Sequence, residues 1–340
     1  MKIINNIKTS TVKKIVSILI VAWSLINTSA YAQQDAHYSL YMFNGLYLNP
    51  AYAGSHEVVD VMGVYRHQWA GIEGAPRTGN VSVSAPMRRN QYALGFVMAG
   101  DKLGLTNSVS FTGSFSYRIQ VKKSKICLGI QASGTYYNQR NSEAIPAQLQ
   151  AQGYTDQMFA VDKNIFLPNV GAGVYVYGKK YYIGLSVPHL VPFKLDKGIG
   201  TSISNGIAHQ YNHYLLTAGY VFGKETSKVK VRPSFLMKYV QGLDNHVPDF
   251  DLSLGLLLMD RFWLGGTYRI ASGYDNKKGT AAVAWMECKV THGLRIGYGF
   301  DYALSGLNQF AKWGSHDIMI GYEFNTKNKR FASPRYVSYF

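Results

Sequence analysis

The chain has 340 residues and a formal net charge of +16, from 35 basic and 19 acidic residues. Charged residues make up 16% of the sequence, against roughly 25% in soluble domains, and 47% is hydrophobic, which is too much for a disordered chain. A bundle of membrane-spanning helices is excluded because no stretch after residue 32 has the roughly 18 consecutive apolar residues that a spanning helix needs. What remains is an all-β chain in which apolar residues alternate with small polar ones.

Residues 1–32 have the features of a secretory signal peptide. Lysines precede the apolar run 15–26, and Ala30-Tyr31-Ala32 forms an A-x-A cleavage site. A signal-anchor helix is the alternative, but the apolar run is short for a membrane span and ends in a cleavage signature. We therefore predict cleavage between Ala32 and Gln33.

Residues 33–57 precede the first strand and are rich in aromatic side chains. Disordered tails lack such a density, because nothing offsets the exposure of these rings to water. The pair Asn49-Pro50 favours a turn, since the proline biases the residue before it away from the helical region. We predict that the segment packs against the strands that follow, where it either only stabilises them or also contacts a partner. The residues expected to carry this role are Tyr41, Phe43, Tyr47, Asn49, Pro50 and Tyr52.

Further along the chain, apolar and polar residues alternate with a period of two, as in strands that face lipid on one side and a polar lumen on the other. In 109–120, for example, the odd positions are Val, Phe, Gly, Phe, Tyr and Ile, and the even positions are Ser, Thr, Arg and Gln. This pattern predicts a transmembrane antiparallel β-barrel of about fourteen strands in the outer membrane of a Gram-negative bacterium. The predicted strands are 58–66, 80–85, 91–99, 109–120, 126–137, 168–178, 181–187, 213–222, 228–239, 249–258, 262–270, 280–290, 294–302 and 316–324.

The links between these segments alternate in length. Short links such as 121–125 and 223–227 alternate without exception with longer ones such as 100–108, 138–167 and 188–212. Outer-membrane barrels have short periplasmic turns and longer outer loops, so the short links are predicted to face the periplasm. A soluble β-sandwich is the alternative fold, but a sandwich has no reason to keep this rhythm.

Four parts result from this interpretation. Residues 1–32 are a cleaved signal peptide, and 33–57 are a segment that plugs the lumen from the periplasmic side. Residues 58–324 form the barrel, and 325–340 are a C-terminal tail.

The strand pattern also assigns side chains to the lumen or to the lipid. Cys127 belongs to the inward set of its strand and Cys288 to the outward set of a distant one, so the two are not expected to form a disulfide. Aromatic residues near strand ends are expected at the level of the lipid headgroups, where an amphipathic ring is stable. These residues are Tyr136, Tyr137, Tyr175, Tyr177, Tyr181, Tyr182, Tyr239, Trp263, Tyr268 and Tyr302.

The sequence contains no phosphate-cradling loop, Gly-x-Ser-x-Gly elbow, His-Glu-x-x-His or Cys-x-x-Cys pattern, the usual motifs of catalytic and metal sites. His246, Asp249 and Asp251 flank one outer loop, but the two aspartates lie on the lumen face, where solvated carboxylates are ordinary. We therefore predict no enzymatic activity, no cofactor and no metal, and nothing beyond the basic composition suggests nucleic acid. Many lysines lie in the short links, where they either are solvated or meet acidic partners or anionic headgroups.

Several blocks of the sequence resemble the type IX secretion system membrane proteins of the PorP/SprF family. The first is 34–55, QDAHYSLYMFNGLYLNPAYAGS, and the second is 65–78, YRHQWAGIEGAPRT. The family-motif residues in the second block are Arg66, Gln68, Trp69 and Pro76. Later blocks of the same kind are 168–175, 184–190, 213–220 and 314–322, so the resemblance covers essentially the whole mature chain. The departures, at Ala36, Leu40 and Gly45, put no part of the fold in doubt.

This resemblance implies a non-enzymatic outer-membrane barrel of the type IX secretion and gliding apparatus. Such a protein assists the export of one large secreted cargo protein, or anchors it at the surface through its C-terminal domain. The resemblance also implies contact with periplasmic components of the secretion machinery, in addition to outer-membrane lipid. A passive channel for small hydrophobic solutes is the alternative function, and it requires a lumen that is open or can open.

The cleavage site can be tested directly. We expect the protein extracted from the membrane to begin at Gln33, because the A-x-A site follows a short apolar run. N-terminal sequencing measures this, and recovery of a chain that still begins at Met1 would refute the prediction.

Overall fold

The computed structural model describes residues 38–87, 90–140, 162–194, 209–210, 212–224, 226–241, 248–271, 279–291, 293–304, 309 and 311–324. The predicted signal peptide and the C-terminal tail lie outside these residues. Among the described residues, no helix has both the length and the apolar character needed to cross a membrane.

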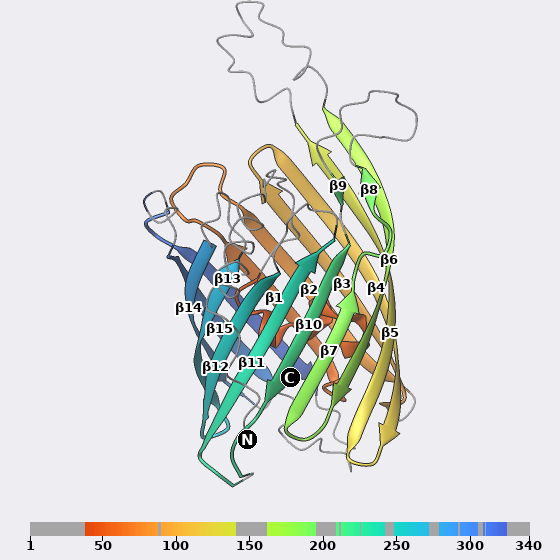
Figure 1. Ribbon diagram of the computed structural model, residues 1–340, viewed down its shortest axis with the longest axis vertical. Helices are drawn as coiled ribbons and strands as arrows, with labels where there is room; N and C mark the ends of the chain where they lie inside the picture. The colour runs from red at the N-terminus through yellow and green to blue at the C-terminus, as the bar shows by residue number, and fades with distance from the viewer. Residues whose placement is uncertain are drawn as a thin grey trace, which may run out of the picture.

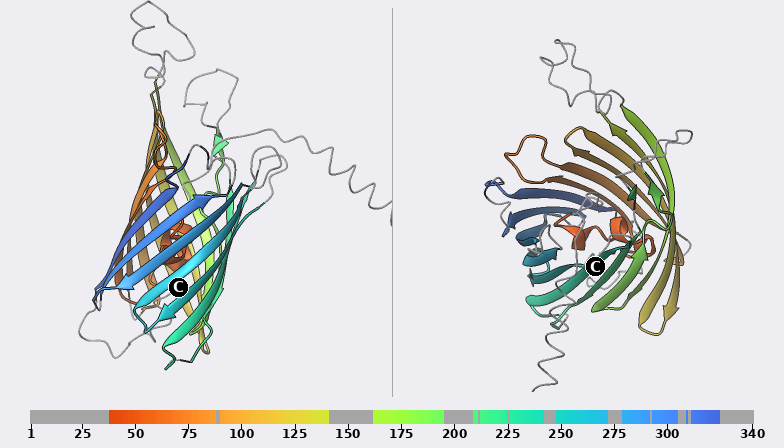
Figure 2. Two further views of the ribbon diagram at one scale, coloured as in Figure 1. Left: turned by 90° about the vertical axis from the view of Figure 1, so that its left-hand side faces the viewer. Right: turned by 45° about the horizontal axis from the view of Figure 1, so that its top comes forward.

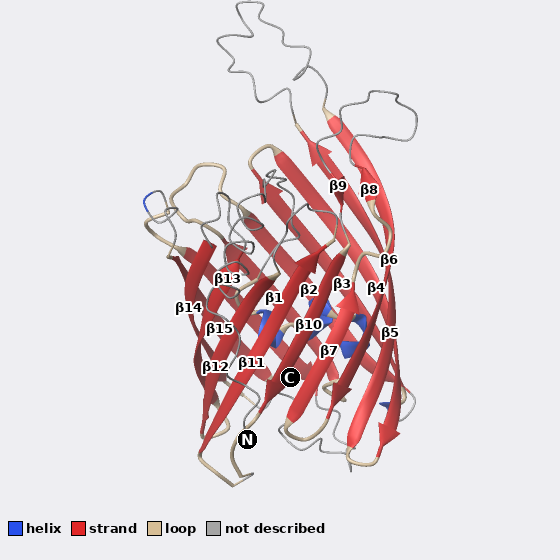
Figure 3. Cartoon of the chain, viewed as in Figure 1, coloured by secondary structure: helices blue, strands red, loops and turns tan. Residues whose placement is uncertain are grey.

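Fourteen antiparallel strands form a closed barrel (Figure 1 and Figure 3). Each strand pairs with the next along the barrel, and β1 closes the sheet by pairing with β16 from Val59↔Phe324 to His67↔His316. The strands are β1 (Val59–His67), β2 (Arg77–Met87), β3 (Tyr92–Leu103), β4 (Thr106–Val121), β5 (Ser124–Gln139), β6 (Lys163–Tyr177), β7 (Tyr181–Val187), β10 (His213–Tyr220), β11 (Val229–Val240), β12 (Asp249–Leu258), β13 (Phe262–Ala271), β14 (Gly279–Lys289), β15 (Leu294–Ala303) and β16 (Ser315–Phe324).

The fold predicted from the alternation is confirmed, and each of the fourteen predicted segments corresponds to one barrel strand. Two further strands, β8 (Phe193–Lys194) and β9 (His209–Gln210), form a separate two-stranded sheet in the predicted link 188–212. Alternation could not predict them, because two residues are too few for a period to show.

The predicted long link 100–108 is wrong. The ladder of β3 and β4 continues to Leu103↔Thr106, so only a turn at Gly104, with φ of +56°, joins these strands. Near this end most residues are polar or glycine and all are half-buried or exposed, as at Asp101 and Lys102, so the two faces no longer differ. Alternation therefore stops before the hydrogen-bonded ladder does, and the strict rhythm of short and long links has an exception here.

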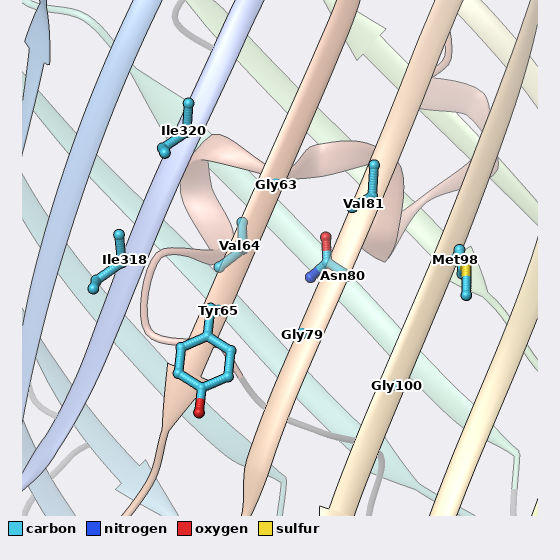
Figure 4. A pocket seen from close by; sticks show the side chains of 10 residues that line it. All are labelled: Gly63, Val64, Tyr65, Gly79, Asn80, Val81, Met98, Gly100, Ile318 and Ile320. Carbon is cyan, nitrogen blue, oxygen red and sulfur yellow. The ribbon is translucent and has the colours of Figure 1, made fainter.

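The outer surface carries the apolar half of each strand. On β12, Leu252, Leu254 and Leu256 are 40–54% exposed, whereas Asp251 and Ser253 between them are buried in the lumen. On β1, β2 and β3, the outward positions include Gly63, Gly79 and Gly100, which leave a shallow apolar hollow on this surface (Figure 4). Its side chains are mainly Tyr65, Val81, Met98, Ile318 and Ile320.

Four of the aromatic residues expected at the headgroup level are buried inside the barrel instead. Tyr175, Tyr177, Tyr182 and Trp263 are at most 9% exposed and belong to the inward set of their strands. Position near a strand end suggested a lipid-facing ring, but strand parity decides which way a side chain points. These rings therefore contribute to the packing inside the barrel. Cys127 is also inside, Cys288 is half-buried, and both are free thiols.

The assignment of lipid and lumen faces predicts opposite effects for two neighbouring positions on β4. Phe111 faces outward and is 45% exposed, while Thr112 faces the lumen and is half-buried. We expect Phe111→Arg to prevent assembly, because an arginine on the lipid face near the midplane costs about 2–4 kcal/mol. Thr112→Arg is the matched control and should assemble. Heat-modifiable migration of the membrane fraction measures assembly, and equal behaviour of the two variants would contradict the assignment.

Candidate functional site

A compact segment fills the lumen, and we name residues 38–57 the plug. It consists of η1 (Tyr41–Phe43), α2 (Gly45–Leu48) and η2 (Pro50–Tyr52), and Figure 2 shows it surrounded by the strands. All of its residues are buried except three that are half-buried. The plug begins beside the long-link ends of β15 and β16 and finishes at β1, near the short turns. It therefore runs through the lumen, further than a stopper at the periplasmic mouth would.

Asn49 and Pro50 hold the centre of the plug. Asn49 is extended, as expected of a residue before proline, and its Oδ1 accepts a hydrogen bond from the Ala51 N–H at 2.9 Å, which caps η2. Its Nδ2 donates to the carbonyl oxygens of Val174 on β6 and Leu185 on β7, at 3.0 and 3.3 Å. One side chain thus fixes the local turn and ties the plug to two strands.

Inward-facing glycines make room for this turn. A Cβ atom at Gly129 on β5 would lie 2.2 Å from the Ala51 nitrogen, and one at Gly173 on β6 would lie 2.2 Å from Asn49 Oδ1. Any larger residue at these two positions would collide with the plug, so the absence of a side chain there is a requirement of the packing.

Inward-facing serines satisfy the backbone of the plug. Ser186 donates to the Leu48 carbonyl at 2.6 Å, and Ser116 donates to the Ala51 carbonyl at 3.2 Å. The Gly54 N–H donates to Ser84 Oγ at 2.7 Å. Because buried backbone groups need partners, these small hydroxyls replace the water that an empty lumen would supply.

A network of two arginines and three aspartates surrounds the start of the plug. Arg66 on β1 lies 2.6 Å from Asp317 on β16 and 2.9 Å from Asp301 on β15. Arg269 on β13 lies 2.7 Å from Asp301 and 3.0 Å from Asp251 on β12. Five strands from one continuous part of the wall are therefore joined on its inner face by buried ion pairs.

Ser39 joins the plug to this network. Its backbone N–H donates to Asp317 at 2.7 Å, and its hydroxyl donates to Asp301 at 2.9 Å. Arg66 in turn donates to the Ser39 hydroxyl oxygen at 2.5 Å. The network holds one more carboxylate than guanidinium groups, and the N–H and O–H groups of Ser39 lie where they stabilise that excess negative charge.

Aromatic rings of the plug contact an adjoining part of the wall, on β11 to β14. Phe43 packs edge-on against Trp285, with ring centroids 5.5 Å apart, and the Arg232 guanidinium lies 4.3 Å from the Trp263 ring and 5.5 Å from Phe43. Desolvated cation–π contacts contribute about 2 kcal/mol or more. Tyr41 shares a hydrogen bond of 3.1 Å with Ser253 on β12, and Tyr47 packs edge-on against Tyr38 within the plug.

The other end of the plug is closed by its own polar contacts. Tyr52 shares a 2.8 Å hydrogen bond with His56 Nε2, and burial raises the pKa of the Tyr52 hydroxyl, so it stays neutral. His56 Nδ1 lies 3.2 Å from Glu323, and Glu57 forms an ion pair with Lys125.

This end also contains the best arrangement for a cation among the described residues. His56, Asp60 and Glu323 offer ligand atoms within 4.8 Å of one another. However, Arg295 already lies 2.6 Å from Asp60 and 3.6 Å from Glu323, and its charge occupies the place of a cation. We therefore assign the cluster to fastening the plug.

The structure brings all six predicted plug residues into the lumen but separates the four family-motif residues. Of those four, only Arg66 reaches the lumen. Gln68 donates its backbone N–H to the Pro76 carbonyl at 3.0 Å and closes the link between β1 and β2. Trp69, with φ of +51°, donates its backbone N–H to Ser315 Oγ at 3.1 Å. These three residues therefore shape the rim at the long-link end.

Five residues of the ion-pair network were missed or misread in the sequence. Ser39, Arg269, Asp301 and Asp317 were not singled out, and Asp251 was interpreted as a solvated carboxylate, whereas it is buried and paired with Arg269. Part of the signal was present. Arg66↔Asp317 and Asp251↔Arg269 are direct cross-strand partners, so opposite charges at inward positions of neighbouring strands could have revealed both pairs.

Comparison with protein families identifies the chain. The model of the type IX secretion system membrane protein PorP/SprF matches residues 30–322. The chain belongs to the PorP/SprF family. The resemblance seen in the sequence blocks is thereby confirmed, and the protein is a non-enzymatic outer-membrane β-barrel of the type IX secretion system.

The comparisons with curated proteins and with solved structures give no close relative. No curated protein matches this PorP/SprF chain. Similar solved structures include the outer membrane protein Omp33 of Acinetobacter baumannii, at 10% identity and TM-score 0.41, covering 79% of this chain and 98% of that one. A Pseudomonas aeruginosa FadL homologue has 12% identity and TM-score 0.44, covering 83% and 94%. The KdgM porin has 7% identity and TM-score 0.37, covering 78% and 100%. At these values the likenesses carry no information on function.

Two glycines of this PorP/SprF barrel allow a test of how closely the plug packs against the wall. A Cβ atom at Gly129 would meet the plug backbone, whereas one at the outward-facing Gly113 would meet no atom within 4 Å. We expect Gly129→Ala to displace the plug, and Gly113→Ala to leave it in place. Hydrogen exchange of residues 38–57 in the assembled barrel measures this. Equally slow exchange in both variants would show that the plug tolerates the lost space.

Proposed function

We propose that this protein assists the export of a large secreted protein, or holds that protein at the cell surface through its C-terminal domain. In this proposal its periplasmic end contacts the secretion machinery. Membership of the PorP/SprF family supports the general role. The filled lumen supports a role in which the barrel binds other proteins at its outer surfaces and passes nothing through its centre. The plug that fills it is hydrogen-bonded to strands on all sides of the barrel.

The alternative, a passive channel for small hydrophobic solutes, requires the plug to leave. Displacing it would separate Ser39 from Asp301 and Asp317 and Asn49 from β6 and β7. Each buried group left without its partner costs about 1–3 kcal/mol, and more where charge is involved. The structure therefore favours a barrel whose lumen stays closed.

The sequence leaves two roles open for the plug, which either only stabilises the barrel or also contacts a partner. The contacts favour the first role. All its described residues face strands or one another, and none is exposed. We propose that the plug sets the shape of the barrel and so of its rims, where partners bind. A role in partner contact would have to use the half-buried residues, such as Tyr47.

The orientation is a separate proposal, with the short turns in the periplasm. Glu73 in the link between β1 and β2 and Lys123 in the turn between β4 and β5 are both exposed and lie at opposite ends. In a background without Cys127 and Cys288, we expect Glu73→Cys to react with an impermeant maleimide on whole cells. Lys123→Cys should react only after the cells are lysed. The reverse pattern would refute the orientation.

The proposed function predicts a specific partner. Affinity purification of the full-length protein from membranes should recover one very large secreted protein, and deletion of the gene should abolish export or surface retention of that protein. Gly113→Ala should behave as wild type in this assay. If deletion instead reduces the uptake of a small hydrophobic solute and leaves secretion unchanged, the protein is a channel and the proposal is wrong.

A further inference from the structure

Six lysines lie together on three neighbouring turns at the short-turn end, and we name them the lysine arc. Lys122 and Lys123 are in the turn after β4, Lys179 and Lys180 in the turn after β6, and Lys224 and Lys228 in the turn after β10. These three hairpins are consecutive around the barrel. The same turns hold one acidic residue in the sequence, Glu225, so the arc is strongly positive.

Hydrogen bonds connect the three turns into one surface. Ser124 and Tyr181 share a hydroxyl–hydroxyl bond of 2.6 Å between the first turn and the second. Lys180 donates to the Gly223 carbonyl at 2.6 Å, and the Val221 N–H donates to the Lys180 carbonyl at 2.7 Å, which joins the second turn to the third. The three turns that carry the lysines are therefore held at fixed positions relative to one another.

The arc begins where the lipid-facing surface ends. Val121, Tyr181, Phe222 and Val229 are the outward residues next to these turns, and they are 39–56% exposed. Lysines within one or two residues of a lipid-facing apolar side chain lie at the level of the headgroup phosphates. Among the described residues, the exposed charges at the opposite end are of both signs, such as Glu73, Arg77 and Lys102, whereas the described residues of the arc are all basic.

We propose that the lysine arc binds the phosphate groups of anionic phospholipids in the leaflet at the short-turn end. Ammonium groups supply the charge, and the Ser124–Tyr181 pair keeps one hydroxyl hydrogen available to a phosphate oxygen. An acidic protein surface would also be attracted to lysines, but it would not need the charges to border the lipid face. The proposal depends on the barrel spanning a membrane and not on the identity of any cargo.

The test uses the full mature protein in a non-ionic detergent, with phosphatidylglycerol and phosphatidylcholine as probes and native mass spectrometry as the measurement. We expect phosphatidylglycerol to be retained more strongly, and the difference to shrink as salt is raised. Replacing Lys122, Lys123, Lys179 and Lys224 by glutamine should lower the affinity for phosphatidylglycerol by about tenfold or more.

The matched control replaces four exposed basic residues at the opposite end, Arg77, Lys102, Arg140 and Lys312, by glutamine. It should keep the wild-type preference, as should the variant with arginine at the four arc positions. Heat-modifiable migration verifies that each variant is assembled, and the pair Lys122→Gln and Lys123→Gln replaces the fourfold variant if that one does not assemble.

Three results would overturn the proposal. Equal retention of the two lipids, or equal losses in the arc and control variants, would show that no headgroup site exists there. Competition by glycerol 3-phosphate at the same concentration as the lipid would show a site for soluble phosphate. Unchanged lipid retention together with loss of a co-purified periplasmic protein would show that the arc is a protein-binding surface.

Discussion

The fold depends on one constraint, that every backbone N–H and C=O within a bilayer must be satisfied inside the protein. The pairing of β1 with β16 satisfies this constraint for the strands, because a closed sheet has no free edge in lipid. Closure creates a second demand. A barrel of fourteen strands leaves a space that its own inward side chains do not fill, and many of those side chains are polar or charged. The plug meets that demand by supplying apolar rings and backbone groups from one short segment.

The plug and the wall are complementary in size and in charge. Gly129 and Gly173 leave space where Asn49 and Pro50 lie closest to the wall, whereas Trp285 extends inward toward Phe43. At the start of the plug, Ser39 completes an ion-pair network whose other members all come from strands. Neither part would be satisfied without the other, since the buried aspartates need the Ser39 donors and the plug backbone needs the inward serines.

The sequence was sufficient to predict the features that follow from a period of two or from local composition. Alternation located fourteen strands, and aromatic density marked 33–57 as ordered. Direct pairs such as Arg66 with Asp317 could also be found once neighbouring strands are aligned. The contact of Asp301 with both Arg66 and Arg269 could not, because β13 and β15 are not neighbours, and only the curvature of the closed barrel brings their side chains together. The inward tyrosines were misplaced for a related reason, since an aromatic residue near a strand end is favourable both in a headgroup layer and against a plug.

A filled lumen moves the functional surfaces of this PorP/SprF barrel to its two rims, and the rims differ in kind. At the long-link end, Gln68, Trp69 and Pro76 form a shaped link held by backbone hydrogen bonds to its neighbours. At the short-turn end, charge dominates, and the lysines border the lipid face. Shape selects a particular protein partner, whereas charge attracts any anionic surface and is weakened by salt. In the function proposed above, specific recognition of a secreted protein would use the long-link rim, and the short-turn rim would contact the surrounding membrane as well as the secretion machinery. The plug, which is fastened near both ends by Ser39 and Glu57, keeps the two rims in a fixed relation.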